Sequence, residues 1–187
     1  MIISFNGDEG AGKSTIAQEV AEKLKFPRYY IGQIFRDLAK KNGMTVGEYG
    51  KKGTDDPTVD KEVDDYILNL SNTQDNFVIE GRMAFHIIPH SIKIYLKVNE
   101  RTGAERIFHQ LKNPNDRNET RNQYENVDEV MQKIKKRKET DNFRYQKYYN
   151  VDIRDEKNYD LVLDTTNLSR EEAFDKVMAF VESKIKS

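Results

Sequence analysis

The sequence has 187 residues, which suits a single domain with a substantial hydrophobic core. Its formal net charge of -1 excludes a general attraction to nucleic acid or anionic membranes, and its lack of cysteine excludes disulfides and thiolate metal sites. No apolar stretch approaches the roughly 20 residues that cross a bilayer, and the first apolar run at 2–5 leaves no room for a targeting peptide, so we expect a cytoplasmic protein.

The apolar pattern predicts strands that alternate with helices. Runs typical of buried strands occur at 2–5, 29–31, 77–80, 92–98 and 161–163. Apolar residues at helical spacing occupy 13–25, 32–42, 57–71, 100–112, 126–149 and 169–185. Ser169 with Glu172 three residues later is a capping-box pattern for the last helix. This order predicts an α/β fold whose parallel sheet is covered by helices on both faces, with ligands beyond the carboxyl ends of the strands.

The first strand-to-helix turn carries a complete G-x-x-x-x-G-K-[ST] motif, Gly7-Asp8-Glu9-Gly10-Ala11-Gly12-Lys13-Ser14. Its glycines let backbone N–H groups surround phosphates, and the amino end of the following helix adds a positive dipole. Lys13 can reach the β- and γ-phosphates, and the Ser14 hydroxyl can ligate Mg²⁺. We therefore predict that Gly7 to Thr15 bind a nucleoside triphosphate.

The stretch 101–149 contains more lysine and arginine than aspartate and glutamate, whereas the rest of the chain is net acidic. Within it, 113–122 has no apolar residue and is predicted to be an exposed, mobile tip. A basic helix–loop–helix inserted between two strands suits a lid that closes over phosphates. An ordinary solvated helical hairpin is the alternative.

The predicted helix at 126–149 has an inward stripe that changes character along its length. Its first positions, Val127, Val130 and Ile134, are apolar, and the next ones on the same face are Arg137, Asp141 and Arg144. Burial of these charges without a partner would be costly, so a ligand is expected to supply the partner. The guanidiniums would grip phosphates while Asp141 contacts the acceptor. A salt-bridged helix surface, with an i,i+4 pair from Arg137 to Asp141, is the alternative.

Other candidate residues lie at the ends of elements. Glu80-Gly81-Arg82 ends the strand at 77–80, where Glu80 can hold Mg²⁺ through water and Arg82 can approach phosphates. Arg36 in the helix at 32–42 is a possible anion ligand. Asp60 and Asp64 lie opposite an apolar helix face, which is more typical of a solvated surface. The histidines are interpreted as structural or surface residues and not as a metal cluster.

These residues together resemble the cytidylate kinase family of nucleoside monophosphate kinases, in its short, archaeal-like form. The similarity covers nearly the whole chain, through the acceptor-binding helix at 32–39, the Gly81-Arg82 pair and an R-x-x-x-D-x-x-R lid pattern at 137–144. The resemblance implies one P-loop kinase domain over 1–187, with a five-stranded parallel sheet in the order 2-3-1-4-5. It also implies acceptor-binding helices at about 32–72 and a helical lid at about 107–145.

The resemblance further implies transfer of a phosphoryl group from ATP to CMP or dCMP, with Mg²⁺, in a monomer without nucleic-acid or membrane partners. The implied catalytic residues are Lys13, Arg82, Arg137 and Arg144. The implied acceptor-binding residues are Gly32, Arg36, Asp60, Asp64, Arg82 and Asp141. The implied metal-binding residues are Ser14 and Glu80.

The chain departs from the family at positions that help to recognise the acceptor. Met83 stands where bacterial relatives have aspartate, and Asp65, Tyr66 and Ile67 stand where archaeal-like members tend to have arginine and glutamine. UMP, AMP or a small molecule therefore stay open as acceptors. From another class, a nucleotide-dependent regulator or RNA-binding protein could use the basic segment 133–149.

Overall fold

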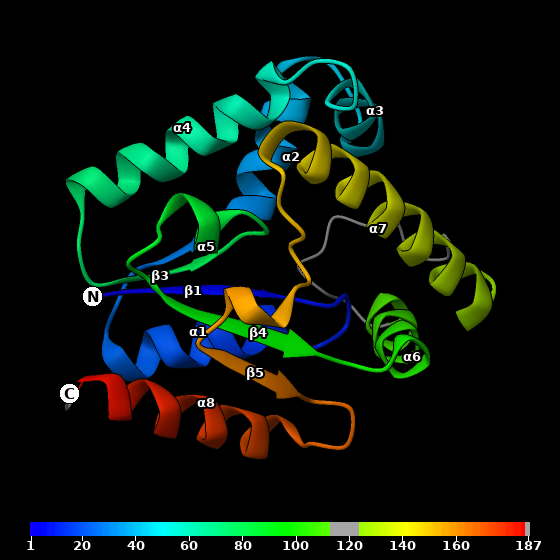
Figure 1. Ribbon diagram of the computed structural model, residues 1–187. Coiled ribbons are helices and arrows are strands. Elements are labelled where there is room, and N and C mark those ends of the chain that lie inside the picture. Colours follow the sequence, from blue (N-terminus) through cyan, green and yellow to red (C-terminus); the bar gives the residue numbers. More distant parts are fainter. Residues whose placement is uncertain (113–123, 186–187) are drawn as a thin grey trace.

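The computed structural model describes residues 1–112 and 124–185 (Figure 1). Five parallel strands form one sheet in the order β2-β3-β1-β4-β5, which confirms the predicted order. The strands are β1 (Ile2–Gly7), β2 (Arg28–Tyr30), β3 (Phe77–Glu80), β4 (Ile92–Lys97) and β5 (Leu161–Asp164). The helices are α1 (Lys13–Leu24), α2 (Ile31–Lys41), α3 (Val46–Lys52), α4 (Thr58–Thr73), α5 (Ala84–Ile87), α6 (Glu100–Lys112), α7 (Val127–Tyr149) and α8 (Arg170–Ile185), with a 3-10 turn at Glu156–Asn158.

Alternate residues of the central strands face opposite layers of helices, because side chains alternate along a strand. Ile3, Phe5 and Val78 pack with Ile94 and Leu96 against α1 and α8. Phe77 and Ile79 face the other way, toward α2, α4 and α5. The sheet is therefore buried on both faces, as a parallel sheet requires.

Helices α6 and α7 lie together beyond the carboxyl ends of the strands, where the arrows of β4 and β5 point in Figure 1. They share a small core of their own, formed by Ala104, Ile107, Leu111, Val130 and Ile134. The apolar half of the α7 stripe is therefore used for packing on α6. The predicted tip at 113–122 lies outside the described residues.

Two short helices were not predicted from the sequence. Helix α3 begins with a capping box in which the Thr45 hydroxyl accepts from the Glu48 N–H while the Glu48 side chain accepts from the Thr45 N–H. Helix α5 has only four residues and follows Met83, which is buried. The predicted Ser169–Glu172 capping box at α8 is confirmed by both of its hydrogen bonds.

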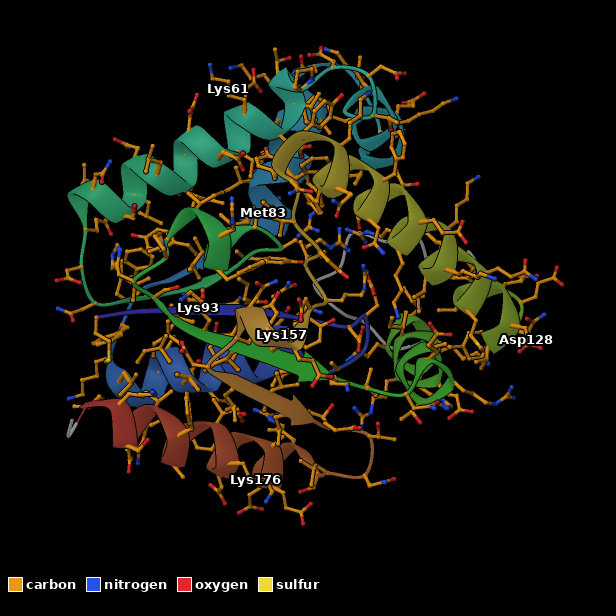
Figure 2. All side chains as sticks on the ribbon, viewed as in Figure 1. Lys61, Met83, Lys93, Asp128, Lys157 and Lys176 are labelled. Carbon is orange, nitrogen blue, oxygen red and sulfur yellow. The ribbon has the colours of Figure 1, made fainter. Side chains whose placement is uncertain are left out.

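Charged side chains cover the outer surface of the helices. Figure 2 shows Lys61, Asp128 and Lys176 projecting from α4, α7 and α8, whereas Met83 lies inside. None of the helices in the described part of the chain is long and apolar enough to cross a membrane.

The phosphate-binding loop packs directly on the backbone of α6. A Cβ at Gly10 would lie 2.2 Å from the Gly103 carbonyl oxygen, and a Cβ at Gly103 would lie 2.5 Å from the Glu9 carbonyl oxygen. Gly103 is buried in α6. The loop and the helix can approach so closely because the facing residues, Gly10 and Gly103, both lack a Cβ.

We predict that Gly103→Ala lowers the free energy of unfolding by roughly 1–3 kcal/mol, because the added methyl group meets backbone that cannot move aside. The matched control is Gly47→Ala in α3, where the nearest atom, Thr45 Oγ1, lies 4.0 Å away. That variant should gain about 0.5–1 kcal/mol from helix propensity. Urea denaturation measures both changes, and equal stability of the two variants would contradict the close packing.

Candidate active site

The glycines of the phosphate-binding loop adopt conformations that other residues rarely reach. Gly10 and Gly12 have φ angles of 81° and 87°, within the left-handed region that favours glycine. Gly12 is the N-cap of α1, and no heavy atom lies within 4 Å of the place a Cβ would take there. The amino end of α1 therefore borders open space, where the helix dipole favours a phosphate.

Lys13, the first residue of α1, folds back over the loop. Its ammonium donates hydrogen bonds to the carbonyl oxygens of Gly7 and Asp8, at 2.8 and 2.6 Å. Burial lowers the pKa of Lys13 to about 8, although the charge of Glu9 opposes this shift. The ammonium is thus held beside the space that phosphates would occupy.

A chain of alternating charges connects the loop to α7. The guanidinium of Arg82, just after β3, lies 2.8 Å from Glu9 and 2.6 Å from Asp141. Burial alone would raise the pKa of Glu9, but neighbouring cations, with Arg82 foremost, lower it to about 2. Glu9 is therefore ionised at neutral pH, and its buried Oε2 has no hydrogen-bond partner among residues 1–112 and 124–185.

The same chain continues through Arg144 to α4. Arg144 Nε lies 2.8 Å from Asp60 Oδ2, and Arg144 Nη2 lies 3.6 Å from Asp141 Oδ1. All three side chains are buried. Burial raises the pKa of Asp60 to about 6, while Arg144 opposes the rise and Asp64 and Asp141 add to it. The interpretation of Asp60 as part of a solvated face was wrong, because α7 covers that part of α4.

Arg137 differs from the other charges on the stripe. It is exposed and forms no ion pair or hydrogen bond with the part of the chain that the structure describes. The i,i+4 pair with Asp141 is not formed, since Asp141 pairs with Arg82 and Arg144 instead. The pKa of Arg137 is lowered, chiefly by the positive charge of Arg82 and to a smaller extent by burial. Two guanidiniums that repel each other in this way favour an anion between them.

The two predicted metal-binding residues are joined by Arg28 of β2. The buried Glu80 carboxylate pairs with the Arg28 guanidinium, which also donates to the Ser14 carbonyl oxygen at 3.3 Å. Among the described residues, no three or more His, Cys, Asp or Glu gather as metal ligands. One hydroxyl and one nearby carboxylate suit Mg²⁺, which usually takes its remaining ligands from phosphates and water.

Four of the six predicted acceptor-binding residues lie on α2 and α4. The Arg36 guanidinium lies over the Tyr30 ring, 5.0 Å from its centre. Gly32 packs against the same ring, because a Cβ there would lie 2.7 Å from it. Asp64 accepts a hydrogen bond from the Tyr149 hydroxyl, and burial nevertheless raises the pKa of Asp64. Helix α7 thus contacts α4 through two separate carboxylates, Asp60 and Asp64.

Met83, the residue that departs from the pattern of bacterial relatives, is part of a small apolar cluster. It is buried with Phe85, Tyr145 and Ile153, where the segment after β3 packs on the carboxyl end of α7. An apolar side chain therefore stands where an aspartate is expected in bacterial relatives, at a position that joins two parts of the site.

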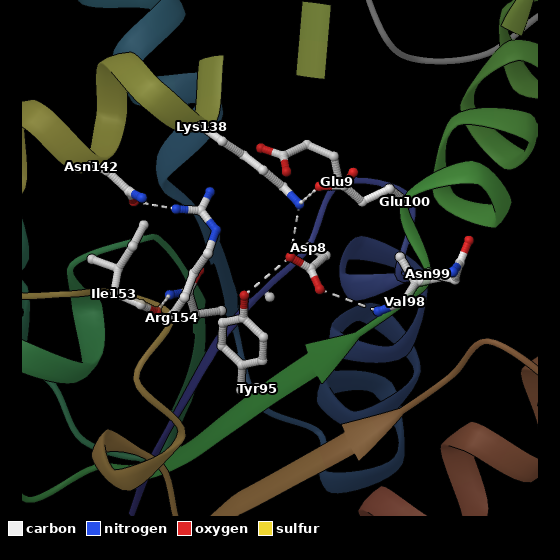
Figure 3. Close-up of polar contacts among 12 residues, drawn as sticks. Asp8, Glu9, Tyr95, Val98, Asn99, Glu100, Lys138, Asn142, Ile153 and Arg154 are labelled. Atoms are coloured by element: carbon white, nitrogen blue, oxygen red, sulfur yellow. Dashed lines mark hydrogen bonds and ion pairs between the residues drawn. The ribbon is translucent and has the colours of Figure 1, made fainter. Parts of the chain in front are cut away.

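Two cations of the site were missed from the sequence. Arg106 of α6 donates to the Gly10 carbonyl oxygen at 3.4 Å and to the Thr165 carbonyl oxygen at 2.8 Å, so it joins the loop to the segment after β5. Lys138 of α7 lies 3.5 Å from Asp8 (Figure 3). Lys138 stands in a run of basic residues, and no spacing pattern distinguishes it from its neighbours.

Comparison with solved structures defines the fold. A shikimate kinase from Bacteroides thetaiotaomicron superimposes with a TM-score of 0.63, at 18% identity, covering 97% of this chain and 98% of its own. An uncharacterized protein from Eubacterium ventriosum gives a TM-score of 0.72, at 18% identity, covering 98% of this chain and 99% of its own. At this identity the likeness concerns the fold alone, which is that of a P-loop kinase.

Sequence comparison defines the family. Residues 2–167 match the cytidylate kinase-like family. A cytidylate kinase from Methanocella arvoryzae is 36% identical over 166 residues, covering 89% of this chain and 88% of its own. Another from Natronomonas pharaonis is 34% identical, covering 99% and 89%. The chain belongs to the cytidylate kinase-like family, and its enzyme class is nucleoside monophosphate kinase.

Stability should separate the two arginines of the α7 stripe. Arg144→Ala leaves Asp60 and Asp141 buried with less compensation, so we predict a loss of about 3–5 kcal/mol in the free energy of unfolding. Arg137→Ala removes an exposed cation that Arg82 repels, so the change should stay below about 0.5 kcal/mol. Urea denaturation without nucleotides measures both. A large loss in Arg137→Ala would mean that this residue serves the fold.

Proposed function

We propose that this kinase transfers the γ-phosphoryl group of ATP to CMP or dCMP and forms the diphosphate. The observation that carries the proposal is the charged stripe of α7. It is linked to the phosphate-binding loop through Arg82 and to α4, one of the predicted acceptor-binding helices, through Asp60. The cytidylate kinases among its relatives support the choice of acceptor. One helix thus contacts both the donor and the acceptor side of the site.

The loop would hold the triphosphate of the donor. Residues Gly7, Asp8, Glu9, Gly10, Ala11, Gly12, Lys13, Ser14 and Thr15 provide the cradle, with the Lys13 ammonium on the β- and γ-phosphates. Ser14 and Glu80 would hold Mg²⁺, which neutralises charge on the phosphate oxygens when it is bound. Glu80 would act through water, because its carboxylate already pairs with Arg28.

The acceptor needs no general base. The second pKa of a phosphate monoester is about 6, so a nucleoside monophosphate is mostly a dianion at neutral pH. Catalysis then consists of positioning and charge neutralisation. Arg36 and Arg82 would hold the acceptor phosphate, and Gly32 lets the chain turn closely around Tyr30. Asp60, Asp64 and Asp141 would contact the acceptor nucleoside.

Helices α6 and α7 would act as the lid. Arg137 is the stripe residue without an ion pair in the described structure, so its guanidinium is available for the transferred phosphoryl group. Arg144 would support it from the acceptor side. A lid in this position excludes water and limits wasteful ATP hydrolysis. The monomeric state and the cytoplasmic location stay predictions.

An acceptor panel tests the substrate directly. With ATP and Mg²⁺, we expect CDP and dCDP to form with a kcat/KM at least ~10-fold above that for UMP, because the acceptor carboxylates would accept a hydrogen bond from the exocyclic amine of cytosine, where uracil has a carbonyl oxygen. AMP, whose base also carries an exocyclic amine, is included to test whether the larger purine is accepted. Chromatography of the diphosphates measures this. Formation of a different nucleoside diphosphate would mean that the acceptor is not CMP or dCMP. ATP hydrolysis without any diphosphate product from the acceptors would favour a regulatory protein.

The charge of Lys13 should appear in the pH profile. Because its pKa is about 8 in the ligand-free protein, the ammonium is charged below this pH and loses its charge above it. We expect kcat/KM for ATP to fall above about pH 8. Lys13→Ala should lower turnover by roughly two to three orders of magnitude, keep its fold by circular dichroism and lose this pH dependence. A flat profile up to pH 9.5 in the unmodified enzyme would contradict the role of the ammonium.

A further inference from the structure

Lys138 follows Arg137 on α7, and its ammonium reaches carboxylates on two other elements (Figure 3). It lies 3.5 Å from Asp8 of the phosphate-binding loop and 3.2 Å from Glu100 at the start of α6. The side chains of Lys138 and Asp8 are 18% and 14% exposed, so solvent screens their pair less than it screens a typical surface pair. Lys138 therefore connects α7 directly to the loop.

Asp8 is a fixed partner for this lysine. The Tyr95 hydroxyl donates to Asp8 Oδ1 at 3.2 Å, and the Val98 N–H donates to Asp8 Oδ2 at 3.3 Å. Tyr95 belongs to β4, next to β1 in the sheet, and is itself buried. The contact of Lys138 with Asp8 thus ties α7 to the core of the sheet.

The place of Lys138 along α7 gives the contact its consequence. Toward the carboxyl end, Asp141 and Arg144 fix the helix by buried ion pairs. Toward the amino end, Val130 and Ile134 pack on α6. Lys138 pairs with the loop in the segment between these contacts. It is one residue from Arg137, which has no ion pair within 1–112 and 124–185.

We propose that Lys138 is a positioning residue that holds Arg137 over the phosphate-binding loop. The inference rests on the proposed function, in which Arg137 contacts the transferred phosphoryl group. Lys138 acts through the helix, because its contact with Asp8 fixes the rotation of α7 about its axis and its distance from the loop next to Arg137. Displacement of a catalytic group by about 1 Å can cost up to ~10²-fold in rate, so a single tether at this point matters.

A double-mutant cycle tests the dependence on Arg137. Lys138→Met should lower kcat by ~10-fold, with both KM values within about 2-fold, and Lys138→Arg should recover most of the loss. The matched control is Lys136→Met, which removes an exposed lysine two residues earlier in the same helix and should keep full activity. In the Arg137→Ala background, Lys138→Met should lower kcat by less than about 2-fold further. Full activity of Lys138→Met, additive losses, or an effect mainly on the KM for ATP would overturn the proposal.

A distance measurement tests the tether without any turnover, so it stands even if the acceptor is not CMP. The chain has no cysteine, so two introduced cysteines would be the only sites that a spin label can react with. Suitable positions are Gln132→Cys on α7 and Lys176→Cys on α8, because both residues are exposed (Figure 2 for Lys176). Lys138→Met should broaden the distance distribution and shift it to longer distances, whereas Lys136→Met should leave it unchanged. Identical distributions for Lys138→Met and the parent would overturn the proposal.

Discussion

The arrangement of the site depends on Arg82, whose guanidinium stands between Glu9 on the loop and Asp141 on α7. Burying a charged pair gains little net stability, since desolvation offsets most of the attraction. Loss of one partner is costly, however, because it leaves a buried charge without compensation. Such a chain of charges therefore fixes where α7 lies relative to the loop more than it stabilises the fold.

The repeating parts of the fold could be predicted from the sequence. Strands buried on both faces appear as short apolar runs, and long helices appear as apolar residues at helical spacing. Helix α3 could not be predicted from apolar spacing, because only Tyr49 of its seven residues is buried and the helix has no apolar stripe. The Thr45–Glu48 capping box is the sequence feature that could have indicated it. Helix α5 is a single turn, too short for any periodicity.

The candidate residues could be predicted, but their pairings could not. The motif at 7–14 and the charged stripe of α7 identify the positions from local spacing alone. Local spacing also predicts the pair of Arg137 with Asp141, and there the structure differs. Arg82 and Arg144 take up the Asp141 carboxylate in buried contacts, which are screened less than an exposed i,i+4 pair. Competition between distant partners of this kind is invisible without the fold.

This competition divides the cations of the site into two groups. Arg28, Arg82 and Arg144 already pair with carboxylates of the protein, so a phosphate that binds Arg82 or Arg144 must share the guanidinium with those carboxylates. Arg137 has no such partner in the described structure, and Lys13 donates to the carbonyl oxygens of Gly7 and Asp8 and not to a carboxylate of the described residues. An ionised Glu9 beside them repels phosphate. A triphosphate on the loop therefore brings more negative charge than Lys13 and Arg137 can balance, which is the electrostatic reason to expect it to enter with a divalent cation.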